Sequence, residues 1–279
     1  MINPFKCFKP LNPGIRTSKL LTRFHLLSQR KPLKFLTRNQ KHATGRNHKG
    51  LITNWNKGKG HSKLYRKVDF YRNRNSYGVV EGLEYDPNRN ANIIRVFNPD
   101  YHNHSYILGV KNCKQGSFIR NHIGSKLGNH LFLKDVPTGF VINNLSVNVS
   151  IPSQYLRAAG TYGQIIYKTQ DHVRIKLRSG EHRMFSGIAS ATLGSVGNEN
   201  SKFIKLGKAG RNRWYGKKPC VRGVAINPVD HPHGGGEGRT SGGRSSVTPW
   251  GKPTKTQATL KKLTAVRVEF KSKKRKKKR

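Results

Sequence analysis

The residue types that could do chemistry stand together at 230–233, which read Asp-His-Pro-His. A carboxylate beside an imidazole could orient a general base, and Ser245 or Ser246 follows as a nominal nucleophile. Side chains of adjacent residues diverge, however, and the intervening proline stiffens the turn, so the spacing does not favour a catalytic triad. A hydrolase that uses Asp230 and His231 is therefore a disfavoured interpretation of this segment.

The same segment is a poor metal site. Asp230, His231 and His233 offer ligands within four residues, but the proline among them prevents all of them from facing one ion readily. The better interpretation is polar contact, in which the imidazoles and the carboxylate hydrogen-bond RNA hydroxyls, bases or the hydration shell of Mg²⁺. No cofactor is expected apart from Mg²⁺ that accompanies RNA.

Gly234, Gly235 and Gly236 continue the segment into a glycine-rich loop. The loop resembles phosphate-cradling loops in composition only, because it lacks the Lys-Ser or Lys-Thr ending of a P-loop. Glycine lets the backbone approach a phosphate closely and adopt positive φ. Nucleotide hydrolysis is therefore disfavoured, and a backbone that closely approaches an anionic ligand is favoured.

Charge is concentrated at both ends of the 279-residue chain, whose formal net charge is +43. Residues 1–68 hold 17 Lys or Arg and no acid, residues 69–195 hold 15 basic and 8 acidic residues, and residues 196–279 hold 23 basic and 4 acidic residues. The net charges are therefore +17, +7 and +19. Such ends repel each other unless a permanent polyanion neutralises them, which predicts RNA-binding arms around a folded centre.

Cationic residues alternate with glycines and aromatic rings at 45–63 and again from 206 onward. Such interleaving is typical of surfaces that pair with phosphates and stack on bases, whereas each aromatic taken singly could instead belong to a small core under a loop. The candidate RNA-binding residues are Arg46, His48, Lys49, Lys57, Lys59, Lys63, Arg157, Lys208, Arg211, Arg213, Trp214, Lys217, Lys218, Arg222, Arg239, Arg244 and Lys252.

The centre of the chain has the pattern of short strands joined by tight turns. Because no long helical pattern interrupts the strands, we expect small closed barrels, the first of the oligonucleotide-binding (OB) type. The predicted organisation is a basic arm and loop at 1–68, an OB-type barrel at 69–125, a second barrel at 126–196 and a Gly/Arg/Lys-rich extension at 197–279. Strands are expected at 79–85, 93–97, 106–110, 140–149, 163–168, 173–177 and 191–196.

Leu20, Leu21, Phe24 and Leu27 have helical spacing in an acid-free segment, a pattern also seen in organelle transit peptides. We favour a retained arm that lies on RNA. The three cysteines are far apart and form no C-x-x-C pair, so they indicate structural thiols. No apolar run approaches the roughly 18 residues of a membrane span, so no membrane partner is expected.

Several segments together carry a family resemblance: GRNHKGLIT at 45–53, EYDPNRNANI at 84–93, AAGTYGQ at 158–164, LRSGEHR at 177–183, and LGKAGRNRWYGKKPCVRGVAINPVDHPHGGGEGR at 206–239, followed by VTPWGKPTK. With these segments the chain resembles the bacterial-type large-subunit ribosomal protein two family from about residue 45 to 256. The C-terminal block is the most specific part of the match.

The resemblance implies an OB-type barrel, then an SH3-like barrel, then an extension buried in ribosomal RNA. It implies large-subunit rRNA, neighbouring ribosomal proteins and the small subunit as partners, and a scaffolding role without enzyme activity. That role covers subunit assembly and association and support of the peptidyl-transferase centre. The residues expected near that centre are Asp230, His231, His233, Gly234, Gly235 and Gly236.

The chain departs from the family pattern at 56–61 and 101–104, where Asn, Lys and His replace glycines or acidic residues. Residues 237–244 look like the α-proteobacterial and mitochondrial version. We therefore expect a mitochondrial ribosome, with a plastid or bacterial cytoplasm as alternatives. The rival function that uses the same arms is a nonribosomal RNA chaperone.

Overall fold

The computed structural model describes residues 4–22, 27, 31–72, 76–148, 150–238, 240 and 242–255. The chain divides into two compact units. The first, here called the barrel unit, comprises residues 1–41, 62–208 and 265–279. The second, here called the glycine-rich unit, comprises residues 42–61 and 209–264.

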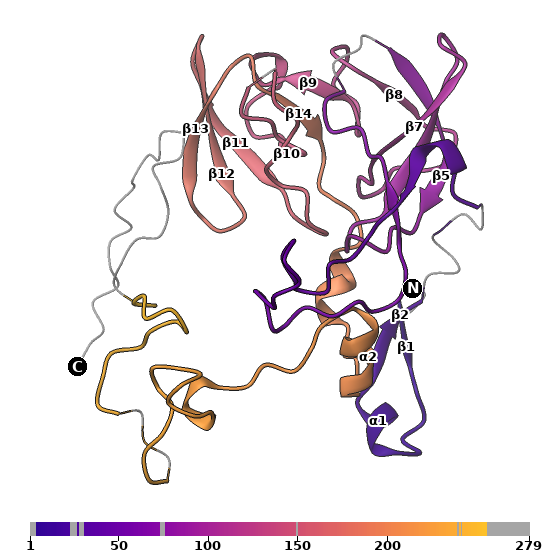
Figure 1. Cartoon of the computed structure of the whole chain (residues 1–279). Helices are drawn as coiled ribbons and strands as arrows, with labels where there is room; N and C mark the ends of the chain where they lie inside the picture. Colours follow the sequence, from indigo (N-terminus) through magenta and orange to yellow (C-terminus); the bar gives the residue numbers. More distant parts are fainter. Residues whose placement is uncertain are drawn as a thin grey trace. The chain divides into compact units, whose positions relative to one another are not determined.

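The described residues are mostly strand and loop (Figure 1). The strands are β1 (Phe5–Cys7), β2 (Lys19–Leu21), β3 (Thr37–Asn39), β4 (Leu64–Arg66), β5 (Tyr77–Glu84), β6 (Ile93–Asn98), β7 (Asn103–Leu108), β8 (Phe118–Arg120), β9 (His130–Phe132), β10 (Val141–Asn143), β11 (Gly163–Lys168), β12 (His172–Leu177), β13 (His182–Ser186) and β14 (Ser190–Leu193). The helices are α1 (Pro13–Arg16), α2 (Ala209–Trp214) and the 3₁₀ helices η1 (Lys34–Leu36), η2 (Leu133–Asp135), η3 (Glu199–Phe203) and η4 (Gly223–Ala225).

The first barrel is a curled antiparallel sheet in the order β7-β6-β5-β8 (Figure 1). Along β5 buried residues alternate with more exposed ones, as the period of a strand requires, and a bulge lies between Val80 and Gly82. Bulges bend and twist a strand, which helps a short sheet to curl. The core consists of Val80, Ile94, Val96, Ile107, Val110, Cys113 and Ile119.

A buried polar cluster ties the N-terminal segment to this barrel. Arg95 Nη2 lies 2.8 Å from Glu84 Oε1, and the Tyr106 hydroxyl donates to Glu84 Oε2 at 2.8 Å. Arg95 also donates to Lys31 O at 2.7 Å, while the Leu33 N–H donates to the Tyr106 hydroxyl. Burial raises the pKa of Tyr106, so the phenol keeps its proton and remains a donor.

The second barrel is a six-stranded sheet in the order β13-β12-β11-β10-β14-β9, with every pairing antiparallel. Val173 and Ile175 on β12 are fully buried, whereas the residues between and beside them are not, which confirms the predicted alternation. The fold is therefore the expected OB-type barrel followed by an SH3-like barrel. The core consists of Leu131, Leu133, Val136, Ile142, Leu145, Ile165, Val173, Ile175, Phe185, Ala189, Ala191 and Leu193.

A polar junction joins the two barrels. The buried Arg72 donates to Asn121 Oδ1 at 3.0 Å on the first barrel, and to Gly128 O at 2.9 Å and Thr192 Oγ1 at 3.3 Å on the second. Desolvation lowers the pKa of Arg72 to about 10, so the guanidinium stays charged at neutral pH. His130 Nδ1 lies 3.0 Å from Thr192 Oγ1, and burial followed by the charge of Arg72 holds the pKa of His130 well below its usual 6.5.

The lowered pKa of His130 predicts a stability that falls with acid. The folded chain keeps this ring neutral, so the unfolded chain binds one more proton below about pH 6.5, and stability is lost at up to about 1.4 kcal/mol per pH unit as the pH falls. Urea unfolding of the full chain, followed by circular dichroism, measures this slope. His130→Gln should flatten it, whereas His172→Gln, at an exposed histidine of β12, should not. A wild-type stability that does not change below pH 6.5 would contradict the assignment.

The N-terminal segment contains more regular structure than its sequence predicted. β1 pairs with β2, β3 pairs with β4, and Lys19 bridges to Lys205, so this part of the chain lies along residues that follow the second barrel. Leu20 and Leu21 stand in the strand β2 and not in a helix. The helical spacing was therefore misleading, because strand pairing with a distant segment decides the local conformation. Phe24 lies outside the described residues.

Several predicted strand bounds differ from the structure because single residues end a strand. β10 stops at Asn143, since Asn144 has φ +48, and β14 stops at Leu193, since Gly194 has φ +103. β7 occupies Asn103–Leu108, earlier than the predicted 106–110. The short strands β8 and β9 were not predicted at all.

Hydrophobic burial is confined to the two barrels. Among the described residues, every buried hydrophobic side chain lies between Val80 and Val196. This distribution agrees with the prediction that only the centre has cores of its own, although the domain limits 68/69, 125/126 and 196/197 stay predictions. Within the described part of the chain, no helix has the length and apolarity needed to cross a membrane.

Candidate nucleic-acid interface

Two distant basic segments, 56–61 and 214–218, lie side by side in the glycine-rich unit. The Gly58 N–H donates to Gly216 O at 2.7 Å, and the His61 N–H donates to Trp214 O at 3.0 Å. The helix α2 ends at Trp214, whose carbonyl takes part in this pairing, and Gly216, with φ +81, turns the chain away from the helix axis.

Glycine is required where these segments touch. A Cβ at Gly60 would lie 2.6 Å from both Gly216 N and Trp214 O, so any side chain there would separate the two backbones. A bridge joins Lys57 to Lys217, and the Lys218 N–H donates to the carbonyl of residue 56 at 3.0 Å. The close approach therefore brings together lysines that are about 160 residues apart in sequence.

Exposed aromatic rings accompany these cations. Trp55 and Trp250 form a tilted pair with centroids 5.8 Å apart, although 53% and 67% of the two side chains remain exposed. Trp214 is 49% exposed and meets His61 edge to face at 6.4 Å. Open indole faces beside lysines can stack on bases while the cations pair with phosphates. The pairing of Trp55 with Trp250 was missed, because the sequence shows Trp55 only as a lone indole in a loop.

The Asp-His-Pro-His segment forms a loop held by its own histidines. His231 Nδ1 accepts the N–H of His233 at 3.0 Å, and His233 Nε2 accepts the N–H of Val247 at 2.9 Å. The two rings stack with centroids 5.1 Å apart, and His231 is only 9% exposed. Its ring packs against Gly223, where an added Cβ would meet the imidazole at about 2.5 Å. Both imidazoles therefore fix the shape of the loop.

This geometry does not form the hydrolase arrangement. A catalytic histidine of the triad type donates its Nδ1 proton to a carboxylate, whereas His231 Nδ1 is occupied as the acceptor of a backbone N–H. Asp230 is exposed, and its own N–H belongs to a turn that closes on Asn227 O. Across the described ranges, no group of three or more His, Cys, Asp or Glu residues is placed to hold a metal ion.

The glycines of this loop are required by its path. Gly235 and Gly236 have φ of +83 and +87, a region that other residues avoid. A Cβ at Gly234 would collide with the carbonyl of Asn227, and one at Gly235 would lie 2.5 Å from the ring of Pro228. The run of three glycines thus lets the chain fold back on itself, and the N–H groups of Gly234 and Gly235 donate to His231 O and Ile226 O within the fold.

Three candidate residues lie in the barrel unit. Arg157 is exposed and stands over the ring of Phe70 at 4.7 Å, with Arg89 on the same ring at 5.4 Å. Lys208 is exposed and Lys63 is half-buried. Phe70 and Arg89 were not among the predicted residues, because their association with Arg157 depends on contacts between barrels and could not be seen in any local pattern.

Several acids of the barrel unit are paired with neighbouring cations. Asp86 is buried and lies 2.6 Å from Arg89 Nε, and Glu199 lies 2.8 Å from Lys111 Nζ. Glu84 is bound by Arg95 inside the first barrel. Each of these carboxylates neutralises the charge of the cation that it contacts. The remaining lysines and arginines therefore dominate the electrostatic potential of the surface.

The predicted residues fall mainly on the surface. Half-buried are Lys63, Arg211, Lys218, His233, Gly234 and Gly235, while His231 is buried and Arg239 lies outside the described residues. Exposed are Arg46, His48, Lys49, Lys57, Lys59, Arg157, Lys208, Arg213, Trp214, Lys217, Arg222, Asp230, Gly236, Arg244 and Lys252. Most of these stand in the glycine-rich unit, and their contacts with RNA stay predictions.

Comparison with known proteins finds one family along most of the chain. Residues 33–121 match the family described as "Ribosomal Proteins L2, RNA binding N-terminal domain", and residues 126–251 match "Ribosomal Proteins L2, C-terminal domain". The curated "Large ribosomal subunit protein uL2" of Rickettsia felis is 47% identical over 259 residues, which cover 92% of this chain and 94% of that protein. Two proteins of the same name are similar to this chain to the same degree. The protein of Rickettsia typhi is 46% identical over 92% of this chain and 94% of its own length. The protein of Rickettsia akari is 47% identical over 91% of this chain and 93% of its own length.

Proposed function

We propose, since the chain belongs to the large ribosomal subunit protein uL2 family, that it is a structural constituent of the large ribosomal subunit and binds ribosomal RNA. The observation that carries this proposal is the glycine-rich unit, in which close backbone pairing gathers exposed lysines, arginines and indoles without a buried hydrophobic core among the described residues. A surface of this kind is stabilised by phosphate and bases.

Within the subunit, the proposed role of the loop at 230–236 is to support the peptidyl-transferase centre. Support for it comes from the hydrogen bonds of that loop, in which His231 and His233 accept backbone N–H groups while Asp230 and Gly236 stay exposed. The N-terminal arm would lie on rRNA. The protein would also contact neighbouring ribosomal proteins and assist subunit assembly and association with the small subunit. Mg²⁺ bound to the rRNA would accompany these contacts.

The chemistry of peptide-bond formation belongs to RNA in this proposal, and the protein is a scaffold with no enzyme activity of its own. A purified, RNA-free chain should leave a generic ester unhydrolysed. Turnover that Asp230→Asn abolishes would instead favour the hydrolase alternative.

The proposed location is a mitochondrial ribosome. It is supported by the similarity to proteins of Rickettsia together with the 237–244 sequence of the α-proteobacterial and mitochondrial type. Fractionation of source cells tests it, since the chain should sediment with large subunits from purified mitochondria. Recovery with plastid or cytoplasmic ribosomes would establish one of the alternatives, and recovery in light fractions would favour the nonribosomal chaperone.

Phosphate contacts predict a steep salt dependence. Arg213→Ala and Arg222→Ala should each reduce the slope of log K against log salt concentration by about 0.9 when the full chain binds large-subunit rRNA. Both side chains are exposed, so their loss should leave the fold unchanged. Lys114→Ala, at an exposed lysine of the first barrel that is not a candidate, is the matched control. Binding that does not depend on salt would contradict the proposal.

A further inference from the structure

A cavity of about 360 Å³, here called the mouth of the first barrel, is lined in part by the core of that barrel. Three core side chains, Val96, Ile107 and Ile119, form part of the lining. Gly78 on β5 also lines it, and a Cβ there would collide with Val96. The volume lies within the range of about 300–1,000 Å³ typical of small-molecule sites, and barrel mouths are among the places where such sites occur.

Around this apolar floor, the polar lining is neutral. Asn98, Asn103 and Asn121 contribute amides, and Ser76 and Ser105 contribute hydroxyls. The amide oxygens of Asn98 and Asn121 already accept hydrogen bonds within the protein. Asn103 and Ser105 carry groups that can both donate and accept at the edge of a heterocyclic base.

The charged groups that border the cavity are engaged elsewhere. The carboxylate of Asp69 accepts the N–H groups of Tyr71 and Arg72, at 2.9 and 3.0 Å. The guanidinium of Arg72 is bound within the junction between the barrels. Among the described lining residues, a phosphate would therefore meet no available cation, and a neutral, planar ligand is favoured.

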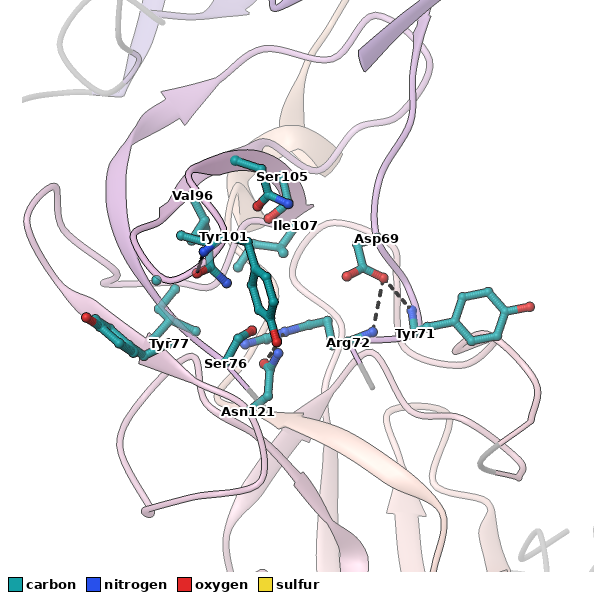
Figure 2. A pocket seen from close by; sticks show the side chains of 14 residues that line it. Asp69, Tyr71, Arg72, Ser76, Tyr77, Val96, Tyr101, Ser105, Ile107 and Asn121 are labelled. Atoms are coloured by element: carbon teal, nitrogen blue, oxygen red, sulfur yellow. Dashed lines mark hydrogen bonds between the residues drawn. The ribbon is translucent and has the colours of Figure 1, made fainter. Parts of the chain in front are cut away.

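Aromatic rings stand at the entrance. Figure 2 shows the ring of Tyr101 directed across the cavity with its hydroxyl end toward Asn121, and Tyr77 on another side of the mouth. These two side chains are 52% and 39% exposed. The faces of exposed tyrosines stack on bases regardless of base identity.

A second hollow of about 270 Å³ shares Ser76, Tyr77 and Asn121 with this mouth. It is lined by Phe118, which is 62% exposed, and by the exposed Arg120 and Asp100, so both a cation and a carboxylate stand there. An aromatic ring and a cation next to a neutral mouth match a nucleotide whose base enters the mouth while its sugar and phosphate follow the adjoining surface.

We propose that the mouth of the first barrel binds one unstacked nucleobase of ribosomal RNA, held by Tyr77 and Tyr101 against the apolar floor, with the amides of the rim on its edge and Arg120 near its phosphate. This inference rests on the proposed function and adds a base-binding site to an interface otherwise made of phosphate contacts. Single-stranded bases can be displayed in this way, whereas a base inside an A-form helix cannot.

The test separates base binding from phosphate binding. The full chain is titrated with a single-stranded RNA of mixed sequence and with an abasic ribose-phosphate oligomer of the same length, and the ratio of the two association constants is measured. Tyr77→Ala combined with Tyr101→Ala should lower this ratio about tenfold, the effect of losing roughly 1.4 kcal/mol of stacking. Tyr167→Ala, at a tyrosine of β11 that is 56% exposed, is the matched control and should leave the ratio unchanged.

Ser105→Phe is an independent variant, since it fills the mouth while keeping both tyrosines. It should lower the ratio like the double variant, and thermal unfolding would show that the barrel is intact. An unchanged ratio in the double variant overturns the proposal. So does an equal loss of affinity for both oligomers, because the tyrosines would then act on phosphate binding or on the fold.

Failure of this inference is distinguishable from failure of the proposed function. If the ratio does not change but the chain sediments with large subunits, only the base-binding site is wrong. If the wild-type chain does not sediment with large subunits, the ribosomal role is wrong, whatever the ratio in the purified system.

Discussion

Gly60→Ala is expected to reduce the fraction of the chain recovered with large ribosomal subunits at least tenfold. The added methyl group would lie 2.6 Å from Gly216 N and from Trp214 O, so the segments 56–61 and 214–218 must move apart. Their separation breaks the hydrogen bonds from Gly58 to Gly216 and from His61 to Trp214. Each hydrogen bond contributes about 0.5–1.5 kcal/mol, and the lysines are also dispersed. The lost binding free energy therefore reaches about 1.4 kcal/mol, which corresponds to a tenfold change in affinity for the subunit.

Gly50→Ala is the matched control for this prediction. Gly50 has φ +79, close to the +65 of Gly60, so an alanine strains the backbone to a similar degree at both positions. Nothing lies within 4 Å of a Cβ at Gly50, however, so this variant should be incorporated nearly as well as the wild type. Equal recovery of the two variants in sucrose gradients would show that the paired segments do not matter for incorporation.

His231→Ala should leave both barrels folded and the chain bound to large subunits, while peptide-bond formation or subunit joining falls severalfold. The substitution removes the acceptor of the His233 N–H, the stacking partner of that ring and the surface that packs on Gly223. The loop then loses about 1–3 kcal/mol of local order, which is enough to displace a positioned segment. The puromycin reaction of purified large subunits measures the first activity, and sedimentation with small subunits measures the second.

A double-substitution cycle makes this prediction specific. His233→Ala removes the acceptor of the Val247 N–H, and because the two rings form one unit, His231→Ala and His233→Ala should not be additive. His42→Ala, at an exposed histidine of the same unit that is not a candidate RNA-binding residue, should have no effect. Normal translation by ribosomes that carry His231→Ala would exclude the proposed role of this loop.

The sequence predicted best what depends on local pattern. The alternation of Val173 and Ile175 identified β12, and the run at 163–168 coincides with β11, because each of these strands is long enough to show its period or its β-branched residues. The turn after Asn98 was also recognised, and there Asn98 Oδ1 accepts the N–H groups of Asp100 and Tyr101.

Features that depend on distant contacts were not predictable. Three-residue strands such as β8 are too short to show any period. The helix α2 contains Gly210 and lacks an apolar face, and it adjoins the pairing of 214–218 with 56–61. The candidate histidines were recognised as chemically distinctive, but no spacing rule shows that their acceptor nitrogens face backbone amides, one of them 14 residues away.

The glycine-rich unit has a consequence for the order of events during synthesis. Its two parts leave the ribosome's exit tunnel far apart in time, since residues 42–61 emerge early and their partners from residue 209 onward emerge only after both barrels. Residues 42–61 therefore remain without their pairing partners while the two barrels fold during synthesis. A nascent chain that terminates before residue 209 would carry folded barrels but no completed glycine-rich unit, so an assembling particle could discriminate finished molecules from truncated ones.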